Sequence, residues 1–235
     1  MNPSKAMHKL IAYTIFTLII VSCKPSPSPE NNAKDTKPID CSDHYAILAW
    51  TNSLQSLNIQ VDYAFFGNSL TVNGPWKQHF PTNKICVLGY GGDDLKRMLR
   101  RVEQITAVHP SYIFLEAGIN TIIFYKNADF ETEYRTLADS IIRSNLSSKL
   151  CLLSMLPVNE SKLDENHPIT NAEINQYNKI IQNIADERKL FYIDLYKLYI
   201  CEGQLPSDIT ADGIHLKQEA YAIWINQIKK YLSEH

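Results

Sequence analysis

One serine, one aspartate and one histidine stand where they could cooperate in nucleophilic catalysis. Ser69 follows a short apolar run in the stretch AFFGNSLTVNG, and Asp212 and His215 stand three residues apart in TADGIHL. A serine hydroxyl is a weak nucleophile at neutral pH, so it needs a base such as an imidazole to accept its proton. An aspartate can orient that imidazole if the backbone turns sharply, which Gly213 would allow. These residues could therefore supply a nucleophile, a base and an orienting carboxylate.

Two other segments could supply donors to a negatively charged oxygen. The glycines of LGYGGDDL, beginning with Gly89, leave backbone amides open to close approach, and Asn120 stands in LEAGINTI. Each segment also has a simpler explanation, because glycines form turns and an asparagine can hydrogen-bond its own loop. Ser69, its neighbour Asn68 and Asp212 could likewise only cap helices. The catalytic interpretation therefore requires all four segments to meet at one place.

The elements that would bring them together follow from alternating patterns of apolar residues. Five short apolar runs predict buried strands, at 61–66, 85–88, 112–116, 150–156 and 190–193. Apolar residues at helical spacing predict helices at 130–141, 174–184 and 220–231, and further helical segments at 44–57 and 93–105. Such alternation indicates parallel strands with right-handed crossovers, so we predict an α/β fold, a three-layer α/β/α sandwich with a five-stranded parallel sheet. Ligands of such sheets bind beyond the carboxyl ends of the strands, where Ser69, Gly89 and Asn120 stand.

The four segments resemble the sequence blocks of the SGNH, or GDSL-type, family of serine esterases and acylhydrolases. The resemblance covers about residues 61–225 and follows the family's order and rough spacing. It implies a triad of Ser69, Asp212 and His215, with oxyanion donors from the N–H groups of Ser69 and Gly89 and from the Asn120 side chain. It also implies a flavodoxin-like strand order 2-1-3-4-5. No metal or organic cofactor is needed for this chemistry.

The sequence departs from the family pattern at two positions. The first block usually reads Gly-Asp-Ser, and here Asn68 takes the place of the aspartate. An asparagine often stands two residues before the second-block glycine, and here that residue is Val87. Neither change removes a triad residue. We expect the first one to alter the hydrogen bonds around the nucleophile.

Composition limits the class of protein and its partners. The chain has 235 residues, of which 45% are hydrophobic and 20% charged, so it can bury one sizeable core. A formal net charge of -2 gives no basic footprint of the kind that phosphate backbones require. We therefore expect one hydrolase domain at 41–235, a monomer, with no nucleic-acid partner.

The N-terminal forty residues read as an export signal followed by a tether. Basic residues precede an uncharged run at 10–22, which has the length of a signal-peptide core and is short for a membrane span. We predict a signal peptide at 1–22 and a flexible, Pro- and Ser-rich tether at 23–40. The run ends at Cys23, which resembles the acylated cysteine of bacterial lipoproteins, although Val21 replaces the usual small residue. The alternative is a free or buried cysteine after a short anchor helix.

Other cysteines and acidic residues suggest structural roles. No cysteine spacing matches a zinc site. With the strand order 2-1-3-4-5, Cys86 and Cys151 would be three strands apart and could not form a disulfide, so we expect two buried thiols, and any bridge would more plausibly involve Cys41 or Cys201. Asp93 and Asp94 stand where a helix should begin, and capping explains them better than metal binding. Four more histidines invite structural explanations: His44, His79, His109 and His167.

Three functional classes remain open from the sequence. The first is a serine esterase, the second a binding protein on the same fold, and the third an acyltransferase, because fold and triad do not determine the acceptor. The loops flanking the proposed site offer only one short apolar stretch, 122–125, which could line an acyl pocket or pack the loop. Polar residues of the loop after the fourth strand could meet a hydroxyl-rich alcohol: Asn159, Glu160, Asp164 and Asn166. We therefore expect a short-chain ester, such as an O-acetyl carbohydrate, handled outside the cytoplasm, with a lipase or lysophospholipase as the alternative.

Overall fold

A parallel five-stranded sheet forms the centre of the described part of the protein. The structure, a computed structural model, describes residues 41–126, 129–165 and 169–234, with side chains from residue 49 onward. All of them belong to the compact unit Cys41–His235. The strands are β1 (Tyr63–Gly67), β2 (Ile85–Gly89), β3 (Tyr112–Glu116), β4 (Lys149–Leu153) and β5 (Phe191–Ile193). Their order is β2-β1-β3-β4-β5, and every neighbouring pair is parallel, so the predicted sheet and strand order are confirmed.

Side chains of the central strands alternate between two apolar cores, one on each face of the sheet. On β1, Ala64 and Phe66 point to one core, and Phe65 points to the other. On β3, Leu115 faces the first core and Phe114 the second. Because both faces of a parallel sheet are covered, the strands read as continuous apolar runs without polar alternation. This explains why the sequence showed them so clearly.

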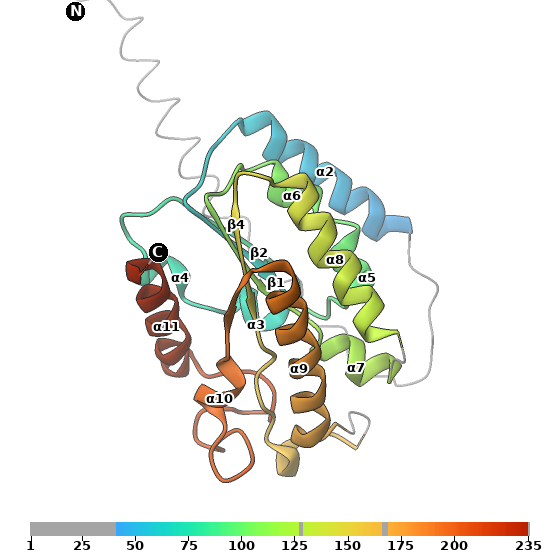
Figure 1. Ribbon diagram of the computed structural model, residues 1–235, viewed down its shortest axis with the longest axis vertical. Helices are drawn as coiled ribbons and strands as arrows, with labels where there is room; N and C mark the ends of the chain where they lie inside the picture. Colours follow the sequence, from blue (N-terminus) through green and yellow to red (C-terminus); the bar gives the residue numbers. More distant parts are fainter. Residues whose placement is uncertain (1–40, 127–128, 166–168, 235) are drawn as a thin grey trace, which may run out of the picture. The chain divides into compact units, whose positions relative to one another are not determined.

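Helices cover both faces, as Figure 1 shows. One face carries α2 (Cys41–Leu57), α5 (Leu95–Leu99), α6 (Glu103–Thr106), α8 (Phe130–Ser144) and α9 (Asn171–Arg188). The other carries α4 (Trp76–His79), α10 (Leu195–Tyr199) and α11 (Tyr221–Glu234). The short α3 (Ser69–Val72) and α7 (Ile119–Tyr125) follow β1 and β3, and two 3-10 turns lie at Glu160–Lys162 and Gln218–Ala220. The fold is therefore the predicted three-layer sandwich.

The helical segment predicted at 93–105 is broken into α5 and α6. At the break, Arg100 and Arg101 donate their N–H groups to carbonyls three residues back, as in a 3-10 turn. The tighter turn lets the Arg101 side chain enter the protein, where only 1% of the residue is exposed. Helical periodicity alone could not predict the break between α5 and α6, because the break accompanies a buried ion pair between Arg101 and Asp93.

The fourth strand ends three residues earlier than its apolar run predicts. Beyond Leu153 the main chain stays buried, but side-chain amides of α9 replace a neighbouring strand as its hydrogen-bond partners. Asn178 bonds both the N–H and the carbonyl of Met155, and Asn171 does the same for Val158. This arrangement carries the chain across the carboxyl edge of the sheet toward the proposed site.

The cysteines partly follow the expectation. Cys151 on β4 is a fully buried thiol, whereas Cys86 is only half-buried because β2 is an edge strand of the sheet. Cys201 is an exposed thiol, so no bridge forms there among the described residues, and the side chain of Cys41 lies outside them. No helix in the described ranges is both long and apolar enough to cross a membrane. The predicted signal peptide, tether and lipidated Cys23 lie outside the described residues.

Candidate active site

Ser69 is the first residue of α3, directly after β1. Asn68 is the N-cap of this helix, and its Oδ1 accepts the N–H of Leu70 at 2.8 Å. The capping role is therefore real, but Asn68 fills it and leaves the Ser69 hydroxyl available. The first N–H groups of a helix have no acceptor within the helix, so the Ser69 N–H is also oriented toward whatever binds at this end.

Gly67 is required by the close approach of α3 to the sheet. A Cβ atom at Gly67 would lie 1.9 Å from Thr71 Oγ1 and 2.7 Å from the carbonyl oxygen of Glu116. Two buried side chains hold the short helix in this position. Tyr221 of α11 donates its hydroxyl to Leu70 O at 2.7 Å, and Trp76 Nε1 donates to Thr71 O at 2.6 Å. A helix of four residues would not be stable by itself, so α3 depends on these tertiary contacts.

The segment that carries Asp212 and His215 is a tight loop before α11. Gly213 has a φ of +89°, a conformation that favours glycine. The turn lets Asp212 Oδ1 accept the N–H groups of Ile214 and His215 at 3.0 and 2.8 Å. Thr210 Oγ1 closes the loop by accepting from Gly213 N and donating to His215 O. The sharp turn expected from the sequence is confirmed.

A continuous line of hydrogen bonds joins the three proposed triad residues. His215 Nε2 lies 2.8 Å from Ser69 Oγ, and His215 Nδ1 lies 2.5 Å from Asp212 Oδ2. Burial acts to raise the pKa of Asp212, but the hydrogen bonds from the His215 ring and from two backbone N–H groups outweigh it and hold the pKa below its usual value. Asp212 is therefore an ionised acceptor that fixes which ring nitrogen of His215 carries the proton.

Asn159 supports this loop and is not available to a substrate. The residue is 4% exposed, its N–H donates to Gly213 O at 2.8 Å, and its Nδ2 donates to Leu205 O at 2.7 Å. The expectation that its side chain could meet an alcohol group is therefore wrong. Glu160 is also engaged, because its Oε1 accepts the first N–H of α9 from Asn171. Asp164 is exposed, and Asn166 lies outside the described residues.

The other side of the site is formed by the glycine loop after β2 and by α7. Asn120, in the first turn of α7, donates its Nδ2 to the carbonyl oxygen of Asp93 at 2.8 Å. Gly89 is buried beneath α3, where a Cβ would lie 2.4 Å from Val72 N. Gly92, farther along the loop, has a φ of +76° and open space around its Cα. The Asn120 amide therefore lies against the loop near Gly92 and Asp93.

Asp93 and Asp94 have different roles. Asp94 is the N-cap of α5 and accepts the N–H of Arg97 at 2.8 Å, which confirms the expected capping. For Asp93 the expectation is wrong, because its carboxylate forms a buried ion pair with Arg101 at 2.6 Å. Burial acts to raise the pKa of Asp93, and the guanidinium of Arg101 opposes that rise.

Arg101 ties the glycine loop to the ends of two strands. Beyond its bond to Asp93, it donates to Leu88 O at 2.8 Å and to Gly67 O at 2.7 Å, and its guanidinium stacks 4.3 Å from the centre of the Phe66 ring. It therefore holds together the strand ends from which the nucleophile turn and the glycine loop depart. Nothing in the sequence pattern distinguishes Arg101 from its neighbours Arg97 and Arg100.

The apolar stretch at 122–125 divides between core and surface. Ile122 and Ile123 are buried and pack the loop against the domain. Phe124 and Tyr125 are 55% and 59% exposed, and the Tyr125 hydroxyl donates to Asp94 Oδ2 at 3.4 Å. Within the stretch 122–125, the exposed side chains are therefore those of the two aromatic residues.

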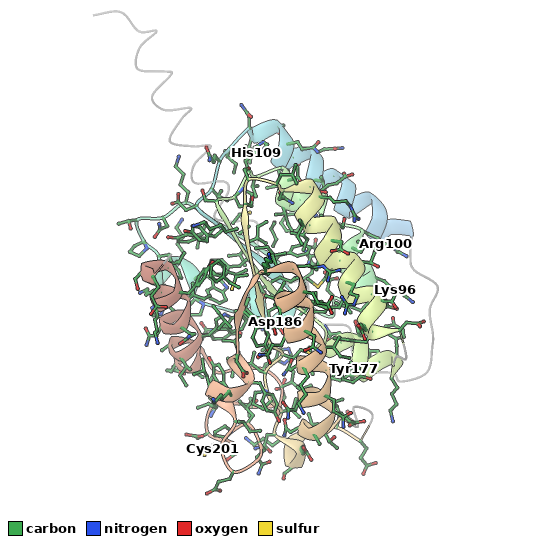
Figure 2. The ribbon with its side chains drawn as sticks, in the orientation of Figure 1. Lys96, Arg100, His109, Tyr177, Asp186 and Cys201 are labelled. Atoms are coloured by element: carbon green, nitrogen blue, oxygen red, sulfur yellow. The ribbon has the colours of Figure 1, made fainter. Side chains whose placement is uncertain are left out.

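The described histidines other than His215 stand on elements other than the two segments that carry the proposed triad. Within the ranges that the structure describes, no three His, Cys, Asp or Glu residues form a metal-binding group. His109 lies far from the loop that carries Cys201 in Figure 2, in the turn that leads into β3. His79 ends α4, while the side chains of His44 and His167 lie outside the described residues.

Comparisons with known proteins identify the family and the fold of the chain. Residues 65–223 match the GDSL-like lipase/acylhydrolase family. A Streptococcus pneumonia structure named for platelet activating factor superposes with a TM-score of 0.70 and 23% identity, covering 82% of this chain and 94% of that one. A GDSL-like lipase from Bacteroides thetaiotaomicron superposes with a TM-score of 0.66 and 21% sequence identity, and the match covers 81% of this chain and 98% of that one. The acetyl xylan esterase AlAXEase superposes with a TM-score of 0.59 and 20% sequence identity, and the match covers 72% of this chain and 98% of that one.

A more distant sequence similarity joins the chain to part of a larger protein. It is 20% identical over 145 residues to an N-acylneuraminate cytidylyltransferase of Streptococcus agalactiae, covering 61% of this chain and 33% of that protein. The chain thus spans about a third of the length of the curated relatives that it matches. The family match spans well over half of the chain and contains Ser69, Asp212 and His215. The chain belongs to the GDSL-like lipase/acylhydrolase family of ester hydrolases.

Proposed function

We propose that the protein hydrolyses short-chain acyl esters by a Ser69–His215–Asp212 triad. The observation that carries the proposal is the line of hydrogen bonds from Ser69 Oγ through the His215 ring to Asp212. Such a line is what general-base activation of a serine requires.

The reaction proceeds in two halves. Ser69 Oγ attacks the ester carbonyl carbon while His215 Nε2 accepts the hydroxyl proton, and the carbonyl oxygen becomes negatively charged. As the tetrahedral intermediate collapses, His215 returns the proton to the departing alcohol and an acyl-serine remains. Water then attacks the acyl group with His215 again acting as the base, and the carboxylic acid leaves.

Donors to the oxyanion come from three elements. The Ser69 N–H lies at the N-terminus of α3, and the Asn120 Nδ2 keeps a second hydrogen beyond the one that it donates to Asp93 O. The third donor is a main-chain N–H of the glycine loop, from Gly89 or from Gly92. Loss of one such donor typically costs about 2.7–4 kcal/mol of transition-state stabilisation.

The substrate in this proposal is a short acyl ester of a carbohydrate, such as an O-acetyl group. Phe124 and Tyr125 are the exposed aromatic side chains of α7, and flat aromatic faces suit sugar rings as well as acyl groups. One structural neighbour is named an acetyl xylan esterase, and a sequence relative is named for N-acylneuraminate, which is also a carbohydrate. Both names favour a carbohydrate, whereas the structural neighbour named for platelet activating factor makes an acetylated phospholipid the competing substrate.

The place of action is part of the proposal. A lipid on Cys23 and the tether 23–40 would hold the domain at the periplasmic or surface face of a bacterial membrane, as a monomer that acts on esters outside the cytoplasm. Acyl transfer to an acceptor, lipase or lysophospholipase activity, and ligand binding without turnover are the competing functions.

Labelling with a serine-directed organophosphonate tests the nucleophile. We expect one phosphonate per chain on the peptide that contains Ser69, and none after Ser69→Ala. Ser53→Ala is the matched control, because Ser53 is an exposed serine of α2 that bonds only its own helix. Wild-type protein that is folded and stays unlabelled would favour the binding protein. Product analysis with and without added sugar acceptors separates hydrolysis from transfer.

A further inference from the structure

A carboxyl group that the proposed reaction does not use lies beneath the nucleophile turn. Glu116 is the last residue of β3 and is 1% exposed. Burial raises the pKa of Glu116 to about 8, and the side-chain amide of Asn68 acts in the opposite direction. At neutral pH the carboxyl is therefore mostly protonated and uncharged.

Several buried polar atoms at this place lack a partner. Among the described residues, both carboxyl oxygens of Glu116, Asn68 Nδ2 and Thr71 Oγ1 are buried without a hydrogen bond. The three side chains are neighbours, since Asn68 acts on Glu116 directly and Thr71 Oγ1 lies over Gly67, the register partner of Glu116. Native proteins rarely leave such groups unpaired, so these atoms are the natural partners of one another.

The orientation of Asn68 decides which atoms can pair. Its Oδ1 already accepts the N–H of Leu70, so the group left to act on Glu116 is the Nδ2 donor. A neutral carboxyl has one acceptor oxygen for this donor and one O–H to donate to Thr71 Oγ1. The Asn68 amide and the Glu116 O–H then each have an acceptor within this group of side chains.

We propose that Asn68 and the neutral carboxyl of Glu116 form a buried pair that positions the turn carrying Ser69. Asn68 then links Glu116, through its own backbone, to the first residue of α3. The proposal rests on the proposed function for its catalytic consequence but not for the pair itself. Glu116 is a positioning residue, because it acts on Ser69 only through Asn68.

The pair explains the departure from the Gly-Asp-Ser pattern. An aspartate at position 68 would place a second carboxyl against Glu116 in a buried site, where two such groups cannot both ionise. The other titratable groups that sense Glu116 are Tyr134 of α8 and Tyr221 of α11. Burial raises the pKa of both tyrosines, so they stay neutral beside it. Asn68 and Glu116 therefore form a matched pair, in which replacing one residue leaves the other without its hydrogen-bond partner.

Four proteins test the proposal: wild type, Glu116→Gln, Asn68→Asp and the double variant. A glutamine has the shape and the donor–acceptor pattern of the neutral carboxyl, so Glu116→Gln should keep kcat within about 3-fold at pH 7. Asn68→Asp should lower kcat at least about 10-fold with little change in KM, and adding Glu116→Gln should restore most of the loss. Asn68→Asp as active as wild type, or a double variant no better than Asn68→Asp, would overturn the pair.

The pH profile supplies a readout that a merely structural role would not move. Ionisation of Glu116 places a negative charge beside Asn68, at the turn that carries Ser69, so wild-type kcat should decline as the pH passes about 8. Glu116→Gln should abolish that decline, and Glu103→Gln, at an exposed carboxyl of α6, should leave it unchanged. An identical alkaline decline in wild type and Glu116→Gln would refute the assignment.

Stability measurements separate this proposal from the proposed function. Because folding raises the pKa of Glu116, its neutral form stabilises the fold at low pH, and this contribution is lost as the pH rises from about 4.5 through about 8. The urea midpoint of Glu116→Gln should vary less with pH across this window than that of wild type. A flatter dependence in a protein without esterase activity would keep the pair and discard the reaction, and an unchanged dependence would discard the pair.

Discussion

Removing the buried guanidinium of Arg101 should destabilise the fold strongly. Arg101→Met keeps much of the apolar volume but removes the partner of the Asp93 carboxylate and two donors to main-chain carbonyls. Breaking a buried pair by deleting one charge costs about 3–5 kcal/mol, because the remaining charge loses its partner. With a urea m-value of roughly 2 kcal/mol per molar, the midpoint of unfolding should fall by about 1.5–2.5 M.

Two further variants make the Arg101 experiment specific. Arg100→Met changes the neighbouring exposed arginine, labelled in Figure 2, and should shift stability by no more than about 0.5 kcal/mol. Asp93→Leu combined with Arg101→Met removes both charges and should be more stable than Arg101→Met alone, since no uncompensated charge remains. Urea unfolding followed by circular dichroism measures all three. An Arg101→Met midpoint equal to that of Arg100→Met would refute the importance of the pair.

The remaining predictions concern the reaction. Ser69→Ala and His215→Ala should each lower kcat at least about 10³-fold, and the double variant little further, because triad residues act as a unit; near-wild-type turnover in Ser69→Ala would remove the mechanism. Rates on p-nitrophenyl esters should drop steeply beyond about four carbons, at ~1–3 kcal/mol per misfitting methylene; equal rates on esters of about eight to twelve carbons would indicate a lipase.

The central strands could be predicted because both faces of the sheet are buried, which makes their sequences continuously apolar, whereas the strand order was implied by the family resemblance. Phe65 and Phe66 face opposite cores, yet both are apolar, and this continuous run marks a strand of a parallel sheet. The regions that carry Ser69 and Asn120 could be located for a related reason, since glycines and polar residues interrupt apolar runs at strand ends, and His215 was located by the short segment TADGIHL before the last helix. Their family resemblance then supplied the roles.

The parts that the sequence did not reveal depend on contacts between distant residues. Arg97, Arg100 and Arg101 look alike in a helical stretch, but only Arg101 turns inward to Asp93. Asn178 looks like any polar residue of a surface helix, but it replaces a strand as the partner of Met155. Glu116 is different, because an acidic residue at the end of the apolar run YIFLE is a visible sign of a buried carboxyl. The sequence pattern can reveal a buried acidic residue such as Glu116, but it cannot reveal which residue pairs with it.

The separation of the catalytic segments along the chain has a consequence for when the enzyme can act. Ser69 and His215 are 146 residues apart, and Tyr221, just beyond the histidine, also holds the serine helix in place. At a synthesis rate of about 5–20 residues per second, roughly 7–30 s therefore pass between the synthesis of Ser69 and that of His215. A nascent chain in which His215 has not yet been made therefore lacks the proposed triad. The triad can form only after the segment that carries His215 and Tyr221 has packed against α3.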